Sequence, residues 1–292
     1  MKPLPKFQIH RPHTIKEALK MLSELDGAKP IAGGTDLLPL LRDGVIKAQN
    51  LIDLNLISEI KYIVEEANEI RIGAASKISE VEKSKLIAEK TPVLSEAAAL
   101  IGSPQIRNLG TIGGNICNAS PAADSAPALL VLDAYAEVTS LKGSRQIPVK
   151  EVFKGPKMNS LEPDELLINV KFPTPSDTSA MSFQKLGRRK GYTMAQVNAA
   201  VLLEFDGPVC CDAKIAVGAS ASTPIRVYAA EEKLWNKRLT EEVVEDASAL
   251  CMRVVNPIDD TRASAEYRRE MSRILVKRAI IDAWNKARRS ML

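Results

Sequence analysis

The segment IAGGTDLLPLL, residues 31–41, places two adjacent glycines and a Thr-Asp pair directly before a run of leucines. A short apolar strand stops at the glycines, and Thr35 or Asp36 can then cap a helix that the leucines begin. Successive backbone N–H groups in a glycine turn, together with the positive end of a helix, favour a phosphate. A tight turn followed by a helix cap explains Gly33, Gly34 and Thr35 equally well without a ligand.

A second glycine pair favours the phosphate interpretation. Residues 110–115 read GTIGGN, and SPAADSAP, residues 120–127, puts Asp124 and Ser125 at the start of another helix. Two glycine turns, each next to a capped helix, can hold a pyrophosphate from two sides. The sequence contains neither the G-x-G-x-x-G pattern of a Rossmann site nor the G-x-x-x-x-G-K-[ST] pattern of a P-loop. A phosphate-bearing cofactor must therefore be held in another way.

The composition is that of a globular protein and disfavours several function classes. Apolar residues make up 45% of the 292 residues and charged residues 26%, and no window approaches the roughly 18 apolar residues of a membrane span. A net charge of +4 with 4% aromatic residues argues against nucleic-acid binding. Four cysteines without a C-x-x-C pair and two histidines argue against a metal site. We expect a soluble cytoplasmic protein with free thiols and no membrane insertion.

The hydrophobic pattern predicts an α+β protein. Thr14 and Glu17 have the spacing of a capping box, Pro92 favours the first turn of a helix, and Lys142 with Gly143 marks a hairpin turn. The expected helices lie at residues 13–25, 92–102, 126–134, 226–235 and 240–255 and in the C-terminal segment. The expected strands lie at residues 29–34, 50–57, 69–76, 136–149, 164–173, 181–189, 195–205 and 212–220.

Three further expectations concern organisation. Residues 103–134 are rich in glycine and proline and poor in charge, which predicts a long functional loop leading into the helix at 126–134. Residues 172–180, FPTPSDTSA, form the best boundary between lobes. The C-terminal helix is expected to bury one apolar stripe, made of Tyr267, Met271, Ile274, Leu275 and Ile281.

The two glycine motifs together resemble the FAD-binding medium subunit of the molybdenum hydroxylases, the family of xanthine dehydrogenase, carbon monoxide dehydrogenase and the archaeal aldehyde oxidoreductases. The resemblance covers essentially the whole chain, including FQIHRPHTIKEAL near the start and FQKLGRRKG after the middle. It implies a PCMH-type FAD-binding region of two α+β subdomains, at residues 1–175 with subdomains of about 1–57 and 58–175. A smaller C-terminal α+β domain with an antiparallel sheet and helices, residues 176–292, would follow.

The resemblance also implies the residues that hold the cofactor. Asp124 matches a position that contacts FAD, and residues 116–120, which end at Ser120, should lie nearby. The residues that would wrap the pyrophosphate and the ribityl chain are Ala32, Gly33, Gly34, Thr35, Asp36 and Leu37. Those that would approach it from the second subdomain are Thr111, Gly113, Gly114 and Asn115.

Lys185 and Tyr192 are the expected residues on the flavin side. Lys185 matches a lysine that faces the flavin, while a solvated strand charge is the alternative for it and for Arg188. Many relatives read R-R-x-G-D-[YF]-A at this point, whereas here Arg189 is followed by KGYTMA. Tyr192 is therefore a hypothesis for the residue that covers the flavin ring, the alternative being an ordinary strand-edge tyrosine.

By the same resemblance, the protein is an oxidoreductase subunit whose redox chemistry belongs to FAD, without catalytic side chains of its own. Its partners would be a large molybdopterin-binding subunit and a small [2Fe-2S] subunit in a dimer of heterotrimers, and an external acceptor would take the electrons. The chain lacks the cysteine-bearing insertion that gives some relatives a [4Fe-4S] cluster. One alternative is a self-contained flavin-dependent reductase of the same fold, and another is a flavin-free scaffold protein.

Overall fold

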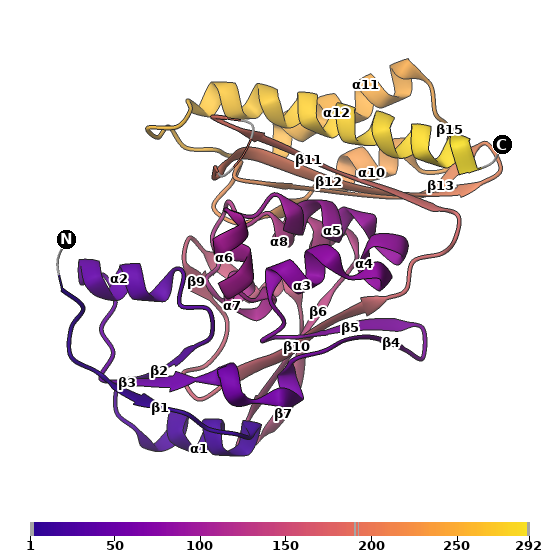
Figure 1. Ribbon diagram of the computed structural model, residues 1–292. Coiled ribbons are helices and arrows are strands. Elements are labelled where there is room, and N and C mark those ends of the chain that lie inside the picture. The colour runs from indigo at the N-terminus through magenta and orange to yellow at the C-terminus, as the bar shows by residue number, and fades with distance from the viewer. Residues whose placement is uncertain (1–2, 190, 192, 291–292) are drawn as a thin grey trace.

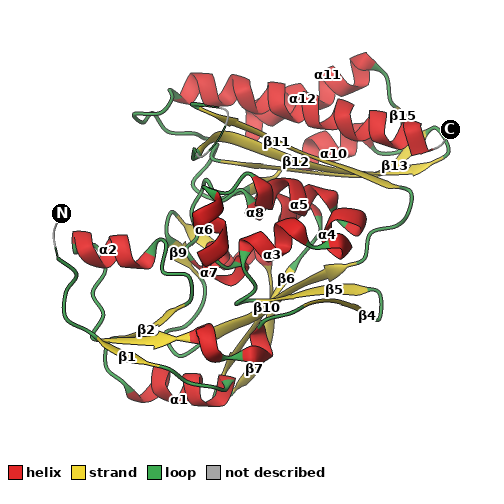
Figure 2. Ribbon diagram, in the orientation of Figure 1, coloured by secondary structure: helices red, strands yellow, loops and turns green. Residues whose placement is uncertain are grey.

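The computed structural model describes residues 3–189, 191 and 193–290 and has the expected α+β class, with helices layered against sheets (Figures 1 and 2). Tyr192 lies outside the described residues. Within them, three sheets follow one another along the chain, accompanied by a small two-stranded hairpin. None of the described helices combines the length and apolar character needed to cross a bilayer. No group of three or more His, Cys, Asp or Glu side chains that could hold a metal occurs in the described part of the chain.

The first sheet is parallel, in the order β1–β3–β2, and one of its strands ends at the first glycine motif. Strands β1, β2 and β3 span Gln8–His10, Ala28–Ile31 and Asn50–Asp53. Helices α1 and α2 span Ile15–Glu24 and Leu37–Asp43, and two 3-10 turns span Leu54–Leu56 and Ser58–Ile60. The parallel order needs a crossover between strands, and α1 and α2 supply it.

Helix α1 begins at Thr14, as predicted. The Thr14 hydroxyl accepts a hydrogen bond from the N–H of Glu17 at 3.2 Å. The Glu17 carboxylate accepts from the N–H of His13 instead of Thr14, so half of the predicted capping box is shifted by one residue. The helix buries one face against the sheet through Ala18, Leu19 and Leu22.

The second sheet is antiparallel, in the order β4–β5–β10–β6–β7. These strands span Ile63–Glu66, Glu69–Gly73, Leu166–Pro173, Tyr135–Ser140 and Gly143–Pro148. Helices α3 to α8 span Ile78–Lys83, Lys85–Lys90, Pro92–Ala99, Pro104–Leu109, Ile112–Cys117 and Ser125–Val131. Helix α9 spans Val149–Val152, and the small hairpin consists of β8 at Phe153–Gly155 and β9 at Met158–Asn159. Figure 1 shows helices α3 to α8 between this sheet and the third one.

The third sheet is antiparallel and has both faces covered. Strands β11 to β15 span Ser179–Gly187, Ala195–Asp206, Val209–Gly218, Ile225–Arg226 and Lys237–Arg238. Along β12, Ala200 and Leu202 join the core that holds helices α3 to α8, while Val201 and Leu203 join the core on the other face. Helices α10 to α12, at Tyr228–Leu234, Glu241–Val254 and Ala265–Ser290, cover that other face (Figure 1). Because successive side chains of a strand point to opposite faces of the sheet, neighbouring residues of β12 pack into two different cores.

One prediction about local structure is wrong, and another is confirmed in part. Residues 103–134 are not one long loop before a helix, because α6 and α7 form within them. The hydroxyls of Ser103 and Thr111 cap these helices by accepting from the N–H groups of Ile106 and Gly114.

In the stripe expected on the C-terminal helix, Leu275 is buried and Met271 and Ile281 pack against the core, whereas Tyr267 is 43% exposed. Helix α12 packs on the third sheet and buries Leu275, Val276, Ala279, Ile280 and Ala283.

Candidate cofactor site

The two glycine motifs, far apart in the sequence, touch in the structure. A Cβ atom at Gly33 would lie 2.2 Å from the carbonyl oxygen of Leu109 and 2.7 Å from Cα of Gly110. Only glycine permits this approach of one backbone to another. The segment that carries Thr35 therefore lies against the start of the segment that carries Thr111. The predicted binding residues of the two motifs thus lie close to one another.

The first motif presents a row of unpaired backbone donors. Gly34 has a φ of +65°, in the left-handed region that favours glycine, and it turns the chain into α2. Asp36 occupies the N-cap position but makes no side-chain cap bond, and no cap bond from Thr35 is found either, so the expected capping is wrong. Within the described residues, the N–H groups of residues 33–37 have no hydrogen-bond acceptor from the protein. Such donors are able to bind an anion.

The second motif does not present unpaired backbone donors as the first does, because its N–H groups already donate hydrogen bonds to acceptors in the protein. The glycines lie in the first turn of α7, where the N–H groups of Ile112 and Gly113 donate to the carbonyl oxygens of Ser76 and Ala74 at 3.0 and 2.9 Å. The N–H of Gly114 donates to the Thr111 hydroxyl at 3.1 Å. We predicted that the backbone N–H groups of both glycine motifs are available for a pyrophosphate. This prediction is wrong for the second motif.

The adjacent glycines of α7 have different roles. A Cβ at Gly113 would lie 2.7 Å from both Cβ and the carbonyl oxygen of Ala74, so Gly113 lets α7 pack on the end of β5. Gly114 is exposed, and a Cβ there would meet only the Thr111 hydroxyl, at 3.0 Å. Gly113 serves the fold, whereas Gly114 faces open space where a ligand can approach.

Side chains following Gly114 are fixed by local hydrogen bonds. The Ser125 hydroxyl donates to Oδ1 of Asn115 at 2.6 Å, which orients the Asn115 amide. The Ser120 hydroxyl accepts from the N–H of Ala122 at 3.3 Å and so stabilises the turn before α8. Burial raises the pKa of the Cys117 thiol to about 12, so this cysteine stays protonated at neutral pH.

Asp124 joins a buried polar cluster at the start of α8. Its Oδ2 lies 2.6 Å from Nζ of Lys185 on β11, and its Oδ1 accepts from Nδ2 of Asn198 on β12 at 2.8 Å. The Lys185 ammonium also donates to the carbonyl oxygen of Leu100 at 2.8 Å. Burial raises the pKa of the Asp124 carboxyl above its ordinary value, and the Lys185 ammonium and the Asn198 amide oppose this rise.

This cluster excludes the alternative of a solvated strand charge for Lys185. The Lys185 side chain is only 6% exposed, so it is not a solvated strand charge. Arg188, three residues later, is exposed. The structure thus places Lys185 with Asp124 in the boundary between the α3 to α8 layer and the third sheet.

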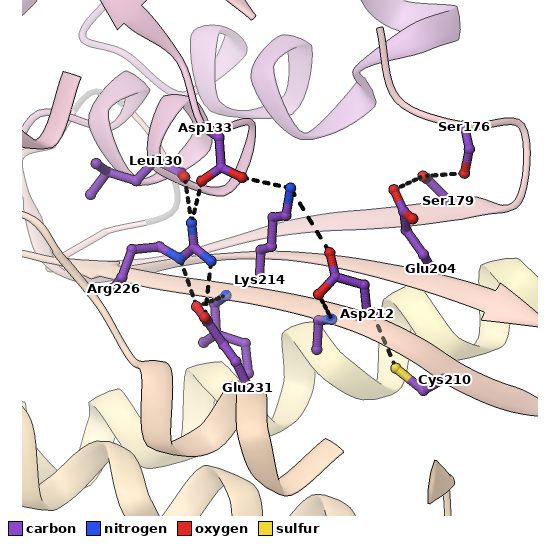
Figure 3. Close-up of polar contacts among 12 residues, drawn as sticks. Leu130, Asp133, Ser176, Ser179, Glu204, Cys210, Asp212, Lys214, Arg226 and Glu231 are labelled. Carbon is purple, nitrogen blue, oxygen red and sulfur yellow. Dashed lines mark hydrogen bonds and ion pairs between the residues drawn. The ribbon is translucent and has the colours of Figure 1, made fainter. Parts of the chain in front are cut away.

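A second network holds the other end of α8, and Figure 3 shows its side chains. Nη1 of Arg226 donates to the carbonyl oxygen of Leu130 at 3.0 Å and to Oδ1 of Asp133 at 2.7 Å. Nε and Nη2 of the same guanidinium donate to the Glu231 carboxylate at 2.6 and 2.9 Å. Lys214 lies 2.6 Å from the remaining oxygen of Asp133. Helix α8, and Asp124 with it, is therefore fixed to the third sheet at both ends.

Two residues near the site escaped the sequence analysis. Asn198 is fully buried, and its position between apolar neighbours in the strand AQVNAAVLLEF was a usable signal. Lys157 lies in the turn between β8 and β9, where its Nζ lies 2.9 Å from Oδ1 of Asn118 and 3.5 Å from Oδ1 of Asp36. No local sequence pattern distinguishes Lys157 from other lysines.

Comparisons with known proteins agree with this architecture. The description "FAD binding domain in molybdopterin dehydrogenase" belongs to the family model that matches residues 5–175. The model described as "CO dehydrogenase flavoprotein C-terminal domain" matches residues 182–283. Together the two matches include both glycine motifs and the Lys185 strand.

Relatives resemble the chain over nearly its full length. The glyceraldehyde dehydrogenase medium chain of Sulfolobus acidocaldarius is 33% identical, over 94% of this chain and 97% of the relative. The carbon monoxide dehydrogenase medium chain of Hydrogenophaga pseudoflava is 32% identical, over 96% and 98%. A solved structure of carbon monoxide dehydrogenase from Hydrogenophaga pseudoflava, in a form lacking the Mo-pyranopterin moiety, superposes with a TM-score of 0.94. Its identity is 33%, and the match covers 97% of this chain and 99% of that one.

Proposed function

The chain belongs to the family of FAD-binding medium subunits of the molybdopterin dehydrogenases, and we propose that it is the electron-transfer subunit of a heteromeric molybdenum hydroxylase. When bound, FAD supplies the redox chemistry, taking electrons from the [2Fe-2S] clusters of a partner subunit and passing them to an external acceptor. The protein residues bind and orient this cofactor.

The row of unpaired amides at residues 33–37 is the observation that carries the proposal. Five consecutive N–H groups without an acceptor among the described residues suit the two phosphates of FAD, and Gly34 makes a left-handed turn within them. Thr35 and Leu37 belong to this segment, and Ala32 precedes it. On the other side, Gly114 leaves space and Asn115 offers a side chain. Gly113 and the buried Thr111 support this side through the contact with Ala74 and the cap of α7.

We assign the remaining predicted residues to the flavin side of the site. Asp124 and Lys185 form a buried pair next to the turn that contains Ser120, and this pair fits the positions inferred from the family resemblance. Tyr192 stays a proposal for the residue that covers the isoalloxazine ring. The division at 1–175 and 176–292, with subdomains of about 1–57 and 58–175, is supported by the ranges of the two family matches and the separate first sheet.

We propose as partners a large molybdopterin-binding subunit and a small [2Fe-2S] subunit, assembled as a dimer of heterotrimers. The relatives named as medium chains support such a complex. We also propose a cytoplasmic location, which the free thiols of Cys210 and Cys251, buried in the third-sheet core, support.

Co-expression tests this function. The chain is produced together with candidate large and small subunits from the same organism, and the complex is isolated by size exclusion. We expect co-elution with FAD and bleaching of the flavin absorbance when the organic substrate of the large subunit is added. A chain that stays a monomer and alone shows the full reductase activity would contradict the proposal and favour the self-contained reductase.

A further inference from the structure

We propose that Lys157 is a cofactor-binding residue, whose ammonium offsets part of the negative charge of the FAD diphosphate. This inference rests on the proposed function, because it concerns the same site. It adds a cationic residue beside the backbone N–H groups of residues 33–37 and the Asp36 carboxylate.

The turn that carries Lys157 is fixed to the end of α7. The N–H of Lys157 donates to the carbonyl oxygen of Ala119 at 2.9 Å, and Nδ2 of Asn159 donates to the carbonyl oxygen of Cys117 at 2.7 Å. Lys157 has a φ of +62°, a conformation that is costly for a residue with a side chain. In Figure 1 this hairpin, marked by β9, lies beside α7 and on the side toward α2. These contacts hold the lysine backbone in place.

The Lys157 ammonium bridges the two glycine motifs. It lies 2.9 Å from Oδ1 of Asn118, at the end of α7, and 3.5 Å from Oδ1 of Asp36, at the start of α2. The Lys157 side chain is 46% exposed, so a ligand can reach it. Among the described residues, Lys157 is the basic side chain that contacts both α2 and α7.

The charges expected around Asp36 and the FAD diphosphate favour a cation at this position. The diphosphate of FAD carries two negative charges at neutral pH, and the amides of residues 33–37 offer dipoles without net charge. The Asp36 carboxylate, 52% exposed, would repel the ligand unless a cation lies nearby. The Lys185 ammonium does not supply this positive charge, because Asp124 already neutralises it in the buried cluster. The single positive charge of Lys157 lies where it can reduce the repulsion between Asp36 and a phosphate.

Titration of FAD into the flavin-free full-length chain, followed by flavin fluorescence, tests this role. In Lys157→Met we expect the Kd for FAD to rise about ten-fold at low salt, because a partly exposed charged contact is lost. The affinity of the wild type should fall with added NaCl more steeply than that of the variant. Lys157→Arg should keep the affinity within about two-fold.

Lys154→Met is the matched control, because Lys154 is exposed on the same hairpin. It should leave the Kd unchanged, and circular dichroism checks the fold of each variant. An Asp36→Asn background separates the two possible roles of Lys157. If Lys157 acts on the diphosphate, Lys157→Met still weakens binding in that background; if Lys157 only pairs with Asp36, the loss disappears and the proposal is overturned.

The outcomes also separate this inference from the proposed function. If the wild type binds no FAD, the proposed function itself fails. If the wild type binds FAD and Lys157→Met, correctly folded, binds it equally well, only the role of Lys157 fails.

Discussion

Oδ2 of Asp124 and Nζ of Lys185 lie 2.6 Å apart, and both side chains are 6% exposed. Asp124 begins a helix of the FAD-binding region, and Lys185 lies on a strand of the third sheet. A buried ion pair of this kind adds little net stability compared with an apolar pair, but removing one member leaves an uncompensated charge. The pair therefore couples the cofactor region to the third sheet.

We predict that Asp124→Ala lowers the free energy of unfolding by about 3–5 kcal/mol. The variant leaves the Lys185 ammonium with only the Leu100 carbonyl and leaves the buried Asn198 amide without its acceptor. Urea unfolding measures the loss. Adding Lys185→Met should recover a large part of it, and a loss below about 1 kcal/mol in the single variant would contradict the structural role assigned to the pair.

The network around Arg226 gives a second prediction. Arg226→Met should destabilise the chain by about 3–5 kcal/mol, because it leaves the buried Glu231 carboxylate without its bidentate partner. Asp133→Asn is the comparison, since the Asp133 side chain is 48% exposed and asparagine tolerates its φ of +49°. Its cost should stay at about 0–1 kcal/mol. Equal losses of unfolding free energy in the two variants would show that burial does not set the cost.

The adjacent glycines of α7 should separate folding from cofactor binding. Gly114→Val meets only the Thr111 hydroxyl, which caps α7, and disturbing this cap should cost about 1 kcal/mol of stability. The same variant should lose stoichiometric FAD. Gly113→Val pushes into Ala74 and should cost at least about 2 kcal/mol. Thermal unfolding and the flavin absorbance of the purified variants check both. A folded Gly114→Val protein that retains full FAD counts against the site.

The pH dependence of stability provides a fourth prediction, centred on Asp260. Burial alone would raise the pKa of Asp260, but hydrogen bonds from the Arg262 N–H, the Arg268 guanidinium and the Ala263 N–H outweigh it. The folded pKa is therefore below the ordinary value of 3.8. A carboxylate of this kind adds stability above its unfolded pKa, and that stability is lost as the pH falls through the folded pKa.

Asp260→Asn should therefore be less stable than the wild type at neutral pH, and the difference should shrink as the pH falls below about 4. Urea midpoints across this range measure the difference. Asp177→Asn is the control, because the Asp177 side chain is 96% exposed, and its curve should follow that of the wild type. A difference between Asp260→Asn and the wild type that stays constant with pH would show that the Asp260 charge does not contribute.

The sequence predicted the features that depend on local pattern. The strand at residues 195–205, the Thr14 cap and the proline that opens α5 at Pro92 follow from near neighbours, and all three are present. The motif at Gly33 was interpreted as a tight turn or an anion site, and its close backbone contact with Leu109 is found only in the structure.

Features that depend on distant contacts were missed. The N–H groups at the start of α7 are paired with the carbonyl oxygens of Ala74 and Ser76, which follow strand β5. The GTIGGN pattern contains no sign of these acceptors. The approach of Lys157 to Asp36 joins residues 121 positions apart. Such pairs are set by the packing of sheets and helices and not by local spacing.

The most direct test of the central claim is amide hydrogen exchange with and without saturating FAD. The account predicts one FAD per chain, with exchange slowed at residues 33–37, whose N–H groups have no acceptor in the described part of the chain. Exchange should change little at Gly113 and Gly114, whose N–H groups are already bonded. Stoichiometric FAD binding with unchanged exchange at residues 33–37 would contradict it.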